Sequence, residues 1–198
     1  MFGSSTIGVI LLFTHILASV SVGIIFGKFL KSEKRMTNSD FKKMSNKKVT
    51  FSSLGEVLSN SIISSIKTIF MIGGFVVIFS VIISILRQSG VIYIFSNIFS
   101  HFFSNSDFLT GILTGIIELT NGLNVVSNIH IKELSVNILI CAFLLGFAGL
   151  SIMFQILSIV SKEKLSIKPY IIGKVLQGIL ATLYTFVILQ LPIFNFDL

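Results

Sequence analysis

Four apolar segments of membrane-spanning length dominate this sequence. They are Ile7–Phe29, Thr68–Leu86, Ile138–Val160 and Tyr170–Leu191. The core of a bilayer requires a helix of about 20 mostly apolar residues, and each segment meets that length. Over the whole chain 53% of the residues are hydrophobic and only 12% are charged, which is about half the charged fraction of an average soluble domain. The sequence therefore predicts an all-α protein, a polytopic membrane helix bundle in the cell membrane.

Positive charge is concentrated between the first two apolar segments. Eight of the fifteen Lys and Arg residues lie between Lys28 and Lys48. Cytoplasmic loops of membrane proteins are enriched in Lys and Arg, which explains the basic run without a nucleic-acid partner. We therefore expect 1–30 to be the first transmembrane helix, 31–52 to be a basic cytoplasmic loop and 53–198 to be a membrane domain. The first apolar segment is too long for a signal peptide, so we expect it to be retained.

An amphipathic segment precedes the second span. In Leu54–Ile66 apolar residues recur at helical spacing, with polar residues such as Asn60 between them. Such a segment suits the membrane interface. Arg87 ends the second span, and we interpret it as an interfacial anchor.

Two shorter apolar segments lie between the second and third spans. Val91–Phe103 has 13 residues, too few to cross a bilayer, and Phe108–Val126 is interrupted by polar residues. The basic loops at 31–52 and Ser161–Lys168 both favour the cytoplasm, so the two ends of the region 88–137 are expected on the outer face. The region must therefore enter the membrane and return, or cross it an even number of times. We predict a broken, re-entrant helical hairpin made of these two short segments.

A polar stretch interrupts the second of these segments at bilayer depth. It consists of an ionisable residue and the hydroxyl, amide and glycine residues that follow, namely Glu118, Thr120, Asn121, Gly122 and Asn124. An ionisable group at this depth costs roughly 2.5–3.5 kcal/mol on insertion scales, so it usually faces a cavity or a partner. Gly and Asn interrupt helices, and transporters use such breaks because the freed backbone groups become ligands. We predict a solute-binding site here; the alternative is that Glu118 pairs with a Lys or Arg to hold two helices together.

Three polar residues on later spans complete the candidate site. Ser151 and Gln155 are four residues apart and therefore share one helix face. They either bind a solute or form hydrogen bonds to a neighbouring helix. Lys174 lies one turn inside the last span, where it either takes part in the site or extends to the cytoplasmic surface.

Other notable residues suit packing better than chemistry. Gly111 and Gly115 form a GxxxG pair, which lets another helix approach closely. His15 suits a hydrogen bond between helices, and Cys141, the one cysteine, suits a small buried hydrophobe. The sequence contains no metal-ligand spacing, cofactor motif or catalytic motif that we recognise. We therefore expect no metal, no cofactor and no enzymatic activity.

Three strings of residues resemble one protein family. They are Gly115–Gly122 (GIIELTNG), Gly146–Gln155 (GFAGLSIMFQ) and Lys168–Lys174 (KPYIIGK), and they resemble sporulation integral membrane proteins of the YlbJ type, in the nucleoside-recognition (Gate) domain group. The resemblance covers nearly the whole chain, but the family's proteins are longer and this chain resembles their C-terminal half. It implies that 53–198 is a Gate-like membrane domain. It also implies a second chain that supplies the N-terminal half, or a homo-oligomer.

The resemblance also implies a biological role in spore formation, in a membrane surrounding the forespore, with transport of dipicolinic acid. We therefore expect a membrane transporter, or transporter half, that moves a small polar or anionic solute. The alternative is a non-transporting membrane assembly factor required for spore maturation, in which the same polar residues hold helices together. A deprotonated Glu118 would repel the dipicolinate dianion unless it is protonated, binds a coupling cation or pairs with a basic group such as Lys174.

Overall fold

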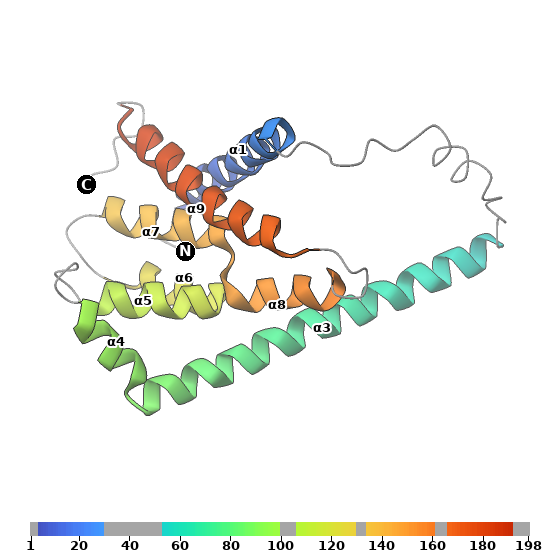
Figure 1. The fold of residues 1–198 in the computed structure, drawn as a ribbon, viewed down its shortest axis with the longest axis horizontal. Coiled ribbons are helices and arrows are strands. Elements are labelled where there is room, and N and C mark those ends of the chain that lie inside the picture. The colour runs from blue at the N-terminus through green and yellow to red at the C-terminus, as the bar shows by residue number, and fades with distance from the viewer. Residues whose placement is uncertain (1–3, 30–52, 100–105, 130–133, 161–165, 192–198) are drawn as a thin grey trace.

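A computed structural model of the chain describes residues 4–29, 53–99, 106–129, 134–160 and 166–191. These residues form a bundle of helices (Figure 1). The helices are α1 (Ser5–Phe29), α3 (Leu54–Gln88), α4 (Val91–Phe99), α5 (Ser106–Ile117), α6 (Leu119–Ser127), α7 (Leu134–Phe147), α8 (Gly149–Val160) and α9 (Lys168–Leu189). The described ranges contain no strand.

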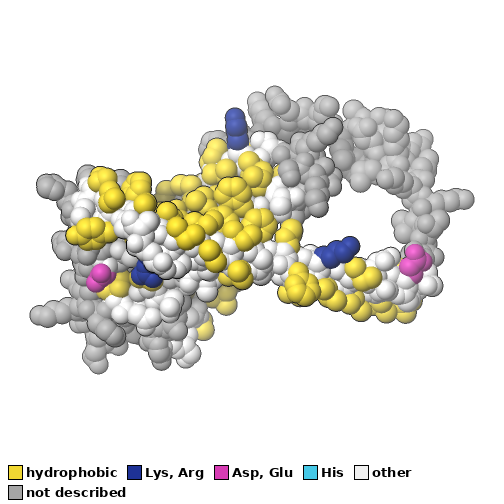
Figure 2. Space-filling view, turned by 90° about the horizontal axis from the view of Figure 1, so that it is seen from below, with side chains coloured by type: hydrophobic (Ala, Val, Ile, Leu, Met, Phe, Trp, Pro, Cys, Tyr) yellow, Lys and Arg dark blue, Asp and Glu magenta, His cyan; other side chains and the backbone are white. Residues whose placement is uncertain are grey.

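Four helical stretches are long and apolar enough to cross a membrane, namely Ser5–Lys28, Leu54–Gln88, Ser135–Ser158 and Lys168–Leu189. Each of them overlaps one of the four predicted spans, and the second extends well beyond its predicted start at Thr68. The prediction of an all-α polytopic membrane bundle is confirmed. Figure 2 shows apolar side chains over much of the described surface on one face, with few charged side chains among them. The predicted basic loop at 31–52 lies outside the described residues, as does most of the loop Ser161–Lys168.

Helix α3 is a single helix of 35 residues that joins the predicted amphipathic segment to the second span. It begins after Ser53, whose side chain accepts a hydrogen bond from the backbone N–H of Glu56, as expected of an N-cap residue. At about 1.5 Å per residue the helix is about 52 Å long, well beyond the roughly 30 Å core of a bilayer. It packs against α8, α4 and α5, and its first turns, as far as Phe70, are exposed.

The hydrophobic core lies where α7 packs against α1, α6 and α9. Its buried members are Ile7, Leu11, Val126, Ile138, Cys141, Ala142 and Leu144. The burial of Cys141 agrees with its interpretation as a small buried hydrophobe. Between α1 and α9 the buried hydroxyl of Thr185 donates a hydrogen bond to Thr14 Oγ1 at 3.0 Å. Small polar residues commonly join membrane helices in this way.

Two of the helical segments are broken. The first break separates α5 from α6 at Glu118, within the predicted polar stretch. The second separates α7 from α8 at Ala148, inside Ile138–Val160, which the sequence predicted as one continuous span. Ala148 and Gly149 have φ angles of 72° and 74°, in the left-handed region that a right-handed helix does not use.

Helices α5 and α6 fold back on each other as a hairpin. Gly122 on α6 packs so closely on Gly115 of α5 that a Cβ atom at Gly122 would overlap the Cα and N atoms of Gly115. At the open end of the hairpin, a Cβ atom on Gly111 would lie 2.6 Å from Val126 Cγ2. The close approach expected of the GxxxG pair therefore occurs within one hairpin. The hairpin forms inside the predicted second arm, Phe108–Val126, whereas the predicted first arm contains α4, which packs against α3 and α5.

Candidate functional site

The break at Glu118 is held by the glutamate itself. Its carboxylate accepts two hydrogen bonds, from the backbone N–H of Thr120 to Oε1 at 3.0 Å and from that of Asn121 to Oε2 at 2.8 Å. The first amides of a helix lack partners within the helix, and an N-cap side chain supplies them. Glu118 has extended backbone angles and only 3% exposure. Its side chain therefore acts as a buried N-cap of α6.

The other end of α6 is held in addition by a residue of α7. The Asn137 side-chain amide donates hydrogen bonds to the carbonyl of Val126 at 3.2 Å and to that of Ile129 at 2.8 Å. Asn137 is itself buried. Unwound backbone within a membrane persists only where protein or a water-filled cavity satisfies its polar groups. Buried polar side chains meet this requirement at both ends of α6.

The second break lies against the first. A Cβ atom on Gly149 would lie 2.9 Å from the carbonyl oxygen of Gly115 and 3.3 Å from the backbone nitrogen of Leu119. The N-terminal end of α8 therefore meets the C-terminal end of α5, and the two helices follow one another along nearly one line in Figure 1. The negative end of one helix dipole thus faces the positive end of the other, which is a favourable arrangement.

Beside the hairpin, a polar cavity of about 280 Å³ opens between the last turns of α3 and α6. Its lining residues are Ser80, Ile83, Ser84, Arg87 and Gln88 on α3, with Asn121, Asn124 and Val125 on α6. The Asn121 amide donates a hydrogen bond to Ser80 Oγ at 2.9 Å and so joins the two helices. Drug-sized ligands usually occupy pockets of roughly 300–1,000 Å³. The cavity therefore suits a small solute.

Arg87 is the charged residue among the described residues that line this cavity. Arg87 carries the positive charge, and the other polar lining residues are amides and hydroxyls. Its guanidinium is a planar fork of N–H donors that matches the two oxygens of a carboxylate. Next to it, the Gln88 amide donates a hydrogen bond to Ser84 Oγ at 3.1 Å. The arrangement can hold a small molecule that carries a carboxylate and further hydrogen-bonding groups.

The residues of the polar stretch that were predicted for the site differ in their positions in the structure. Asn121 and Asn124 line the cavity. Glu118 and Gly122 are buried in the hairpin, where they fix the position of α6. Thr120 is exposed on the first turn of α6. The polar stretch therefore contains both lining residues and the residues that hold them in place.

The predicted residues on later helices lie elsewhere. Ser151 and Gln155 are buried on α8, which packs against α3 and α5, and the Gln155 amide donates to Ser151 Oγ at 3.5 Å. Lys174 lines a different cavity, between α1 and α9. The structure therefore does not bring Lys174 together with Asn121 and Asn124.

Four polar lining residues were not among the predicted site residues, and all lie on α3: Ser80, Ser84, Arg87 and Gln88. The sequence alone indicates only an interfacial anchor at Arg87. The sequence did carry a signal, because residues at positions i, i+4 and i+7 share one face of a helix, and Ser80, Ser84 and Arg87 have this spacing. What the sequence did not specify was that this face meets α6.

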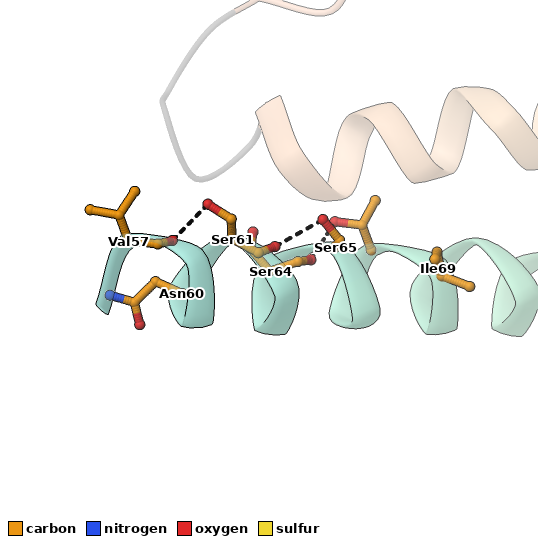
Figure 3. A pocket seen from close by; sticks show the side chains of 7 residues that line it. Val57, Asn60, Ser61, Ser64, Ser65 and Ile69 are labelled. Atoms are coloured by element: carbon orange, nitrogen blue, oxygen red, sulfur yellow. Dashed lines mark hydrogen bonds between the residues drawn. The ribbon is translucent and has the colours of Figure 1, made fainter. Parts of the chain in front are cut away.

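A larger cavity, of about 790 Å³, runs along the first half of α3 (Figure 3). The described residues that line it all belong to α3, and most are small and polar: Val57, Asn60, Ser61, Ser64, Ser65, Thr68 and Ile69. The hydroxyls of Ser61, Ser65 and Thr68 donate to backbone carbonyls one turn earlier in the same helix, at 2.8–2.9 Å. Small hydroxyl residues are typical of contacts between membrane helices.

Comparison with known proteins places the chain near one curated relative. It is 26% identical over 205 residues to the sporulation integral membrane protein YlbJ of Bacillus subtilis (strain 168), and the match covers 92% of this chain. The similarity supports YlbJ-type homology. The chain spans about half the length of this relative, 48% of it being matched. No family model and no solved structure matches the chain.

Proposed function

We propose, from this homology and from the cavity beside the broken hairpin, that the chain is a membrane transporter or transporter half for a small polar or anionic solute. The YlbJ relative is named as a sporulation membrane protein, so we place the role in spore formation, in a membrane surrounding the forespore. The family resemblance makes dipicolinic acid the first solute to test. Because the chain spans about half the length of the relative, the solute and the transport activity belong to this proposal.

The observation that carries the proposal is the position of Arg87 in a polar cavity next to two broken helices. Broken helices with polar residues near the middle of a membrane are typical of solute sites in transporters. A guanidinium surrounded by amides and hydroxyls suits an anion that also accepts or donates hydrogen bonds. Arg87 would bind a carboxylate of the solute, and Asn121 and Asn124 would contact its remaining polar groups.

In this mechanism Glu118 is a positioning residue. Its carboxylate oxygens accept hydrogen bonds from the first amides of α6, where the positive end of the helix dipole favours a negative charge. Glu118 is not among the residues that line the cavity. The repulsion expected between a deprotonated Glu118 and a dianion is thereby reduced, while Arg87 attracts the solute.

The test is dipicolinate binding to the purified full chain by calorimetry. We expect Arg87→Gln to weaken binding at least about tenfold, because a hydrogen bond to a charged group contributes about 1.5–3 kcal/mol. Lys67→Gln is the matched control, since Lys67 is an exposed cation on the same helix and outside the cavity. It should bind within about twofold of wild type. Equal dipicolinate binding by folded wild type and folded Arg87→Gln would contradict the assignment of this cavity as the solute-binding site.

The alternative is a non-transporting membrane assembly factor required for spore maturation. One observation favours it, namely that part of the polar stretch stabilises the hairpin. Glu118 caps α6, and Gly122 packs against Gly115. Spore dipicolinate distinguishes the two functions in sporulating cells. Transport predicts low spore dipicolinate in Arg87→Gln cells that contain a normal amount of the protein. A block in spore morphology with normal dipicolinate favours the assembly factor.

We also propose that α3 pairs with a second membrane segment, in a second chain that supplies the other half or in a second copy of this chain. The support is its exposed hydroxyl-rich first half, along the cavity of Figure 3. Oxidative crosslinking of Ser64→Cys, in a Cys141→Ser background, tests the homo-oligomer. We expect a dimer band from Ser64→Cys and none from Ile72→Cys, which lies two turns further along α3 and outside the cavity lining. Monomer alone in both variants leaves a different chain as the partner.

A further inference from the structure

A third cavity, of about 400 Å³, lies between α1 and α9. Its lining combines polar residues, Ser19, Tyr170, Lys174 and Gln177, with the apolar residues Val22 and Phe26. The wall therefore has an amphiphilic character. The cavity is separate from the one at Arg87, because its lining comes from different helices.

Lys174 brings a positive charge into this cavity without an acidic partner on either helix. Its ammonium donates a hydrogen bond to Gln177 Oε1 at 3.0 Å and lies 6.0 Å from the centre of the Tyr170 ring. Neither α1 nor α9 contains an Asp or Glu. The acidic residues among the described parts of the chain are Glu56, Asp107 and Glu118, all on α3, α5 or the break that follows α5. A charge within a membrane-spanning helix usually pairs with an opposite charge or marks a functional site.

The hydrogen bonds around Lys174 hold it at the cavity wall. Gln177 accepts from Lys174, and its amide nitrogen lies 3.5 Å from His15 Nε2 on α1. Gln177 is thereby placed between the two helices. The first turn of α9, with Pro169 and Tyr170 on the same wall, has no side-chain cap. The positive end of the helix dipole therefore adds to the potential of the ammonium.

The predicted topology puts the cavity at the membrane face where anionic lipids concentrate. It is formed by the second half of α1 and the first half of α9, which are the ends that adjoin the basic segments at 31–52 and Ser161–Lys168. The positive-inside bias places these ends in the cytoplasm. Basic pockets between transmembrane helices on this side bind the head groups of anionic lipids. The apolar lining residues Val22 and Phe26 are themselves partly exposed, which leaves the apolar side of the cavity open to acyl chains.

We propose that this cavity binds an anionic phospholipid. Lys174 binds the lipid phosphate, and Ser19 and Gln177 are placed to form hydrogen bonds with its head group. The apolar wall at Val22 and Phe26 holds the start of an acyl chain. This site is independent of the proposed transport of a solute, because its lining shares no residue with the Arg87 cavity.

The test measures lipid binding to the purified full chain by native mass spectrometry. Phosphatidylglycerol is the probe, phosphatidylcholine is the neutral-lipid comparison, and glycerol 3-phosphate is the free anion. Wild type should prefer phosphatidylglycerol to both. Lys174→Gln should weaken that binding at least about fivefold, as expected for one Lys near an anionic head group. Lys174→Arg should preserve it, and Lys168→Gln, on the exposed first turn of the same helix, should remain within about twofold of wild type.

Three results would overturn the proposal. One is unchanged phosphatidylglycerol binding by folded Lys174→Gln, and another is equal binding of the two lipids by wild type. The third is displacement of the lipid by glycerol 3-phosphate at equal concentration, which would assign the cavity to a free anion. If Lys174→Gln does not fold, Val22→Phe provides a second test, because it fills the apolar wall without changing the charge. It should weaken phosphatidylglycerol binding, and unchanged binding would exclude the acyl-chain contact.

Discussion

Gly149 packs directly on the carbonyl oxygen of Gly115, so that the break between α7 and α8 rests on the end of α5. A Cβ atom at Gly149 would lie 2.9 Å from that oxygen, which is closer than real Cβ contacts normally are. The two broken segments therefore meet at their breaks. The cavity that contains Arg87 depends on this junction, because the junction fixes the start of α6, which carries Asn121.

The first prediction concerns the left-handed residues at this junction. Gly149→Ala should lower the free energy of unfolding by about 1–2 kcal/mol, because a Cβ atom is disfavoured at a φ of 74°, and the contact with Gly115 should add to the loss. Ala148→Gly should leave stability unchanged or raise it slightly, because Ala148 has a φ of 72°. Ala181→Gly, in the interior of α9, is the control and should lose about 1 kcal/mol. Denaturant titration in detergent micelles measures all three.

The second prediction concerns the close approach within the hairpin. Gly122→Ala should lose about 1–3 kcal/mol or prevent folding, because the added Cβ would meet backbone atoms of Gly115, and backbone cannot move aside cheaply. Gly73→Ala is the matched control, since a Cβ atom there has nothing within 4 Å. It should be neutral or stabilising by up to about 1 kcal/mol, because Ala is the better helix former. Similar losses in both variants would contradict the hairpin geometry.

The third prediction separates capping by Glu118 from direct contact with a solute. Glu118→Ala should lower the free energy of unfolding by about 0.5–2 kcal/mol, as expected for the removal of an N-cap. Glu118→Asp should recover part of that loss, because Asp is also a good N-cap. Glu56→Ala, on the exposed first turn of α3, should lose less than about 1 kcal/mol. A Glu118→Ala protein with wild-type stability and no dipicolinate binding would contradict the capping role.

The fourth prediction concerns the contact between α1 and α9. A double-mutant cycle of Thr14→Val and Thr185→Val should give a coupling energy of about 0.6–2 kcal/mol, the range measured for hydrogen bonds between membrane helices. Both side chains are fully buried, and their hydroxyls lie 3.0 Å apart. The pair Ser61→Val and Thr185→Val is the control, because Ser61 lies on α3 and bonds within its own helix. Additive effects of the Thr14 and Thr185 changes would show that this hydrogen bond contributes little.

The sequence predicted the four spans and the first break for clear physical reasons. Apolar runs of sufficient length predict membrane helices wherever they pack. Glu118 and the Asn and Gly residues after it are costly in an apolar helix, so they mark a break without any tertiary information. Of the predicted site residues, Asn121 and Asn124 line the cavity at Arg87. Whether these residues bind a solute stays a prediction.

The second break was missed because its cause is tertiary. Ala148 is a strong helix former, and nothing in its own chemistry predicts a φ of 72°. The contact of Gly149 with the end of α5 accompanies the break, and single-chain periodicity does not reveal that contact. For a similar reason the sequence does not separate Lys174 from the polar stretch. Its polarity was evident, but its packing beside α1 and away from α6 depends on the arrangement of the helices.

The hydrogen bonds from Asn137 to the end of α6 have a consequence for how the protein is made. Helices α5 and α6 have 12 and 9 residues, and neither reaches the length of about 20 residues that a helix needs to cross a bilayer by itself. Asn137, which donates hydrogen bonds to the carbonyls of Val126 and Ile129 at the end of the hairpin, belongs to α7, which leaves the ribosome afterwards. We therefore expect the hairpin to remain at the membrane surface until α7 is synthesised. It would then insert into the bilayer together with α7. The order of entry into the bilayer would then differ from the order of synthesis.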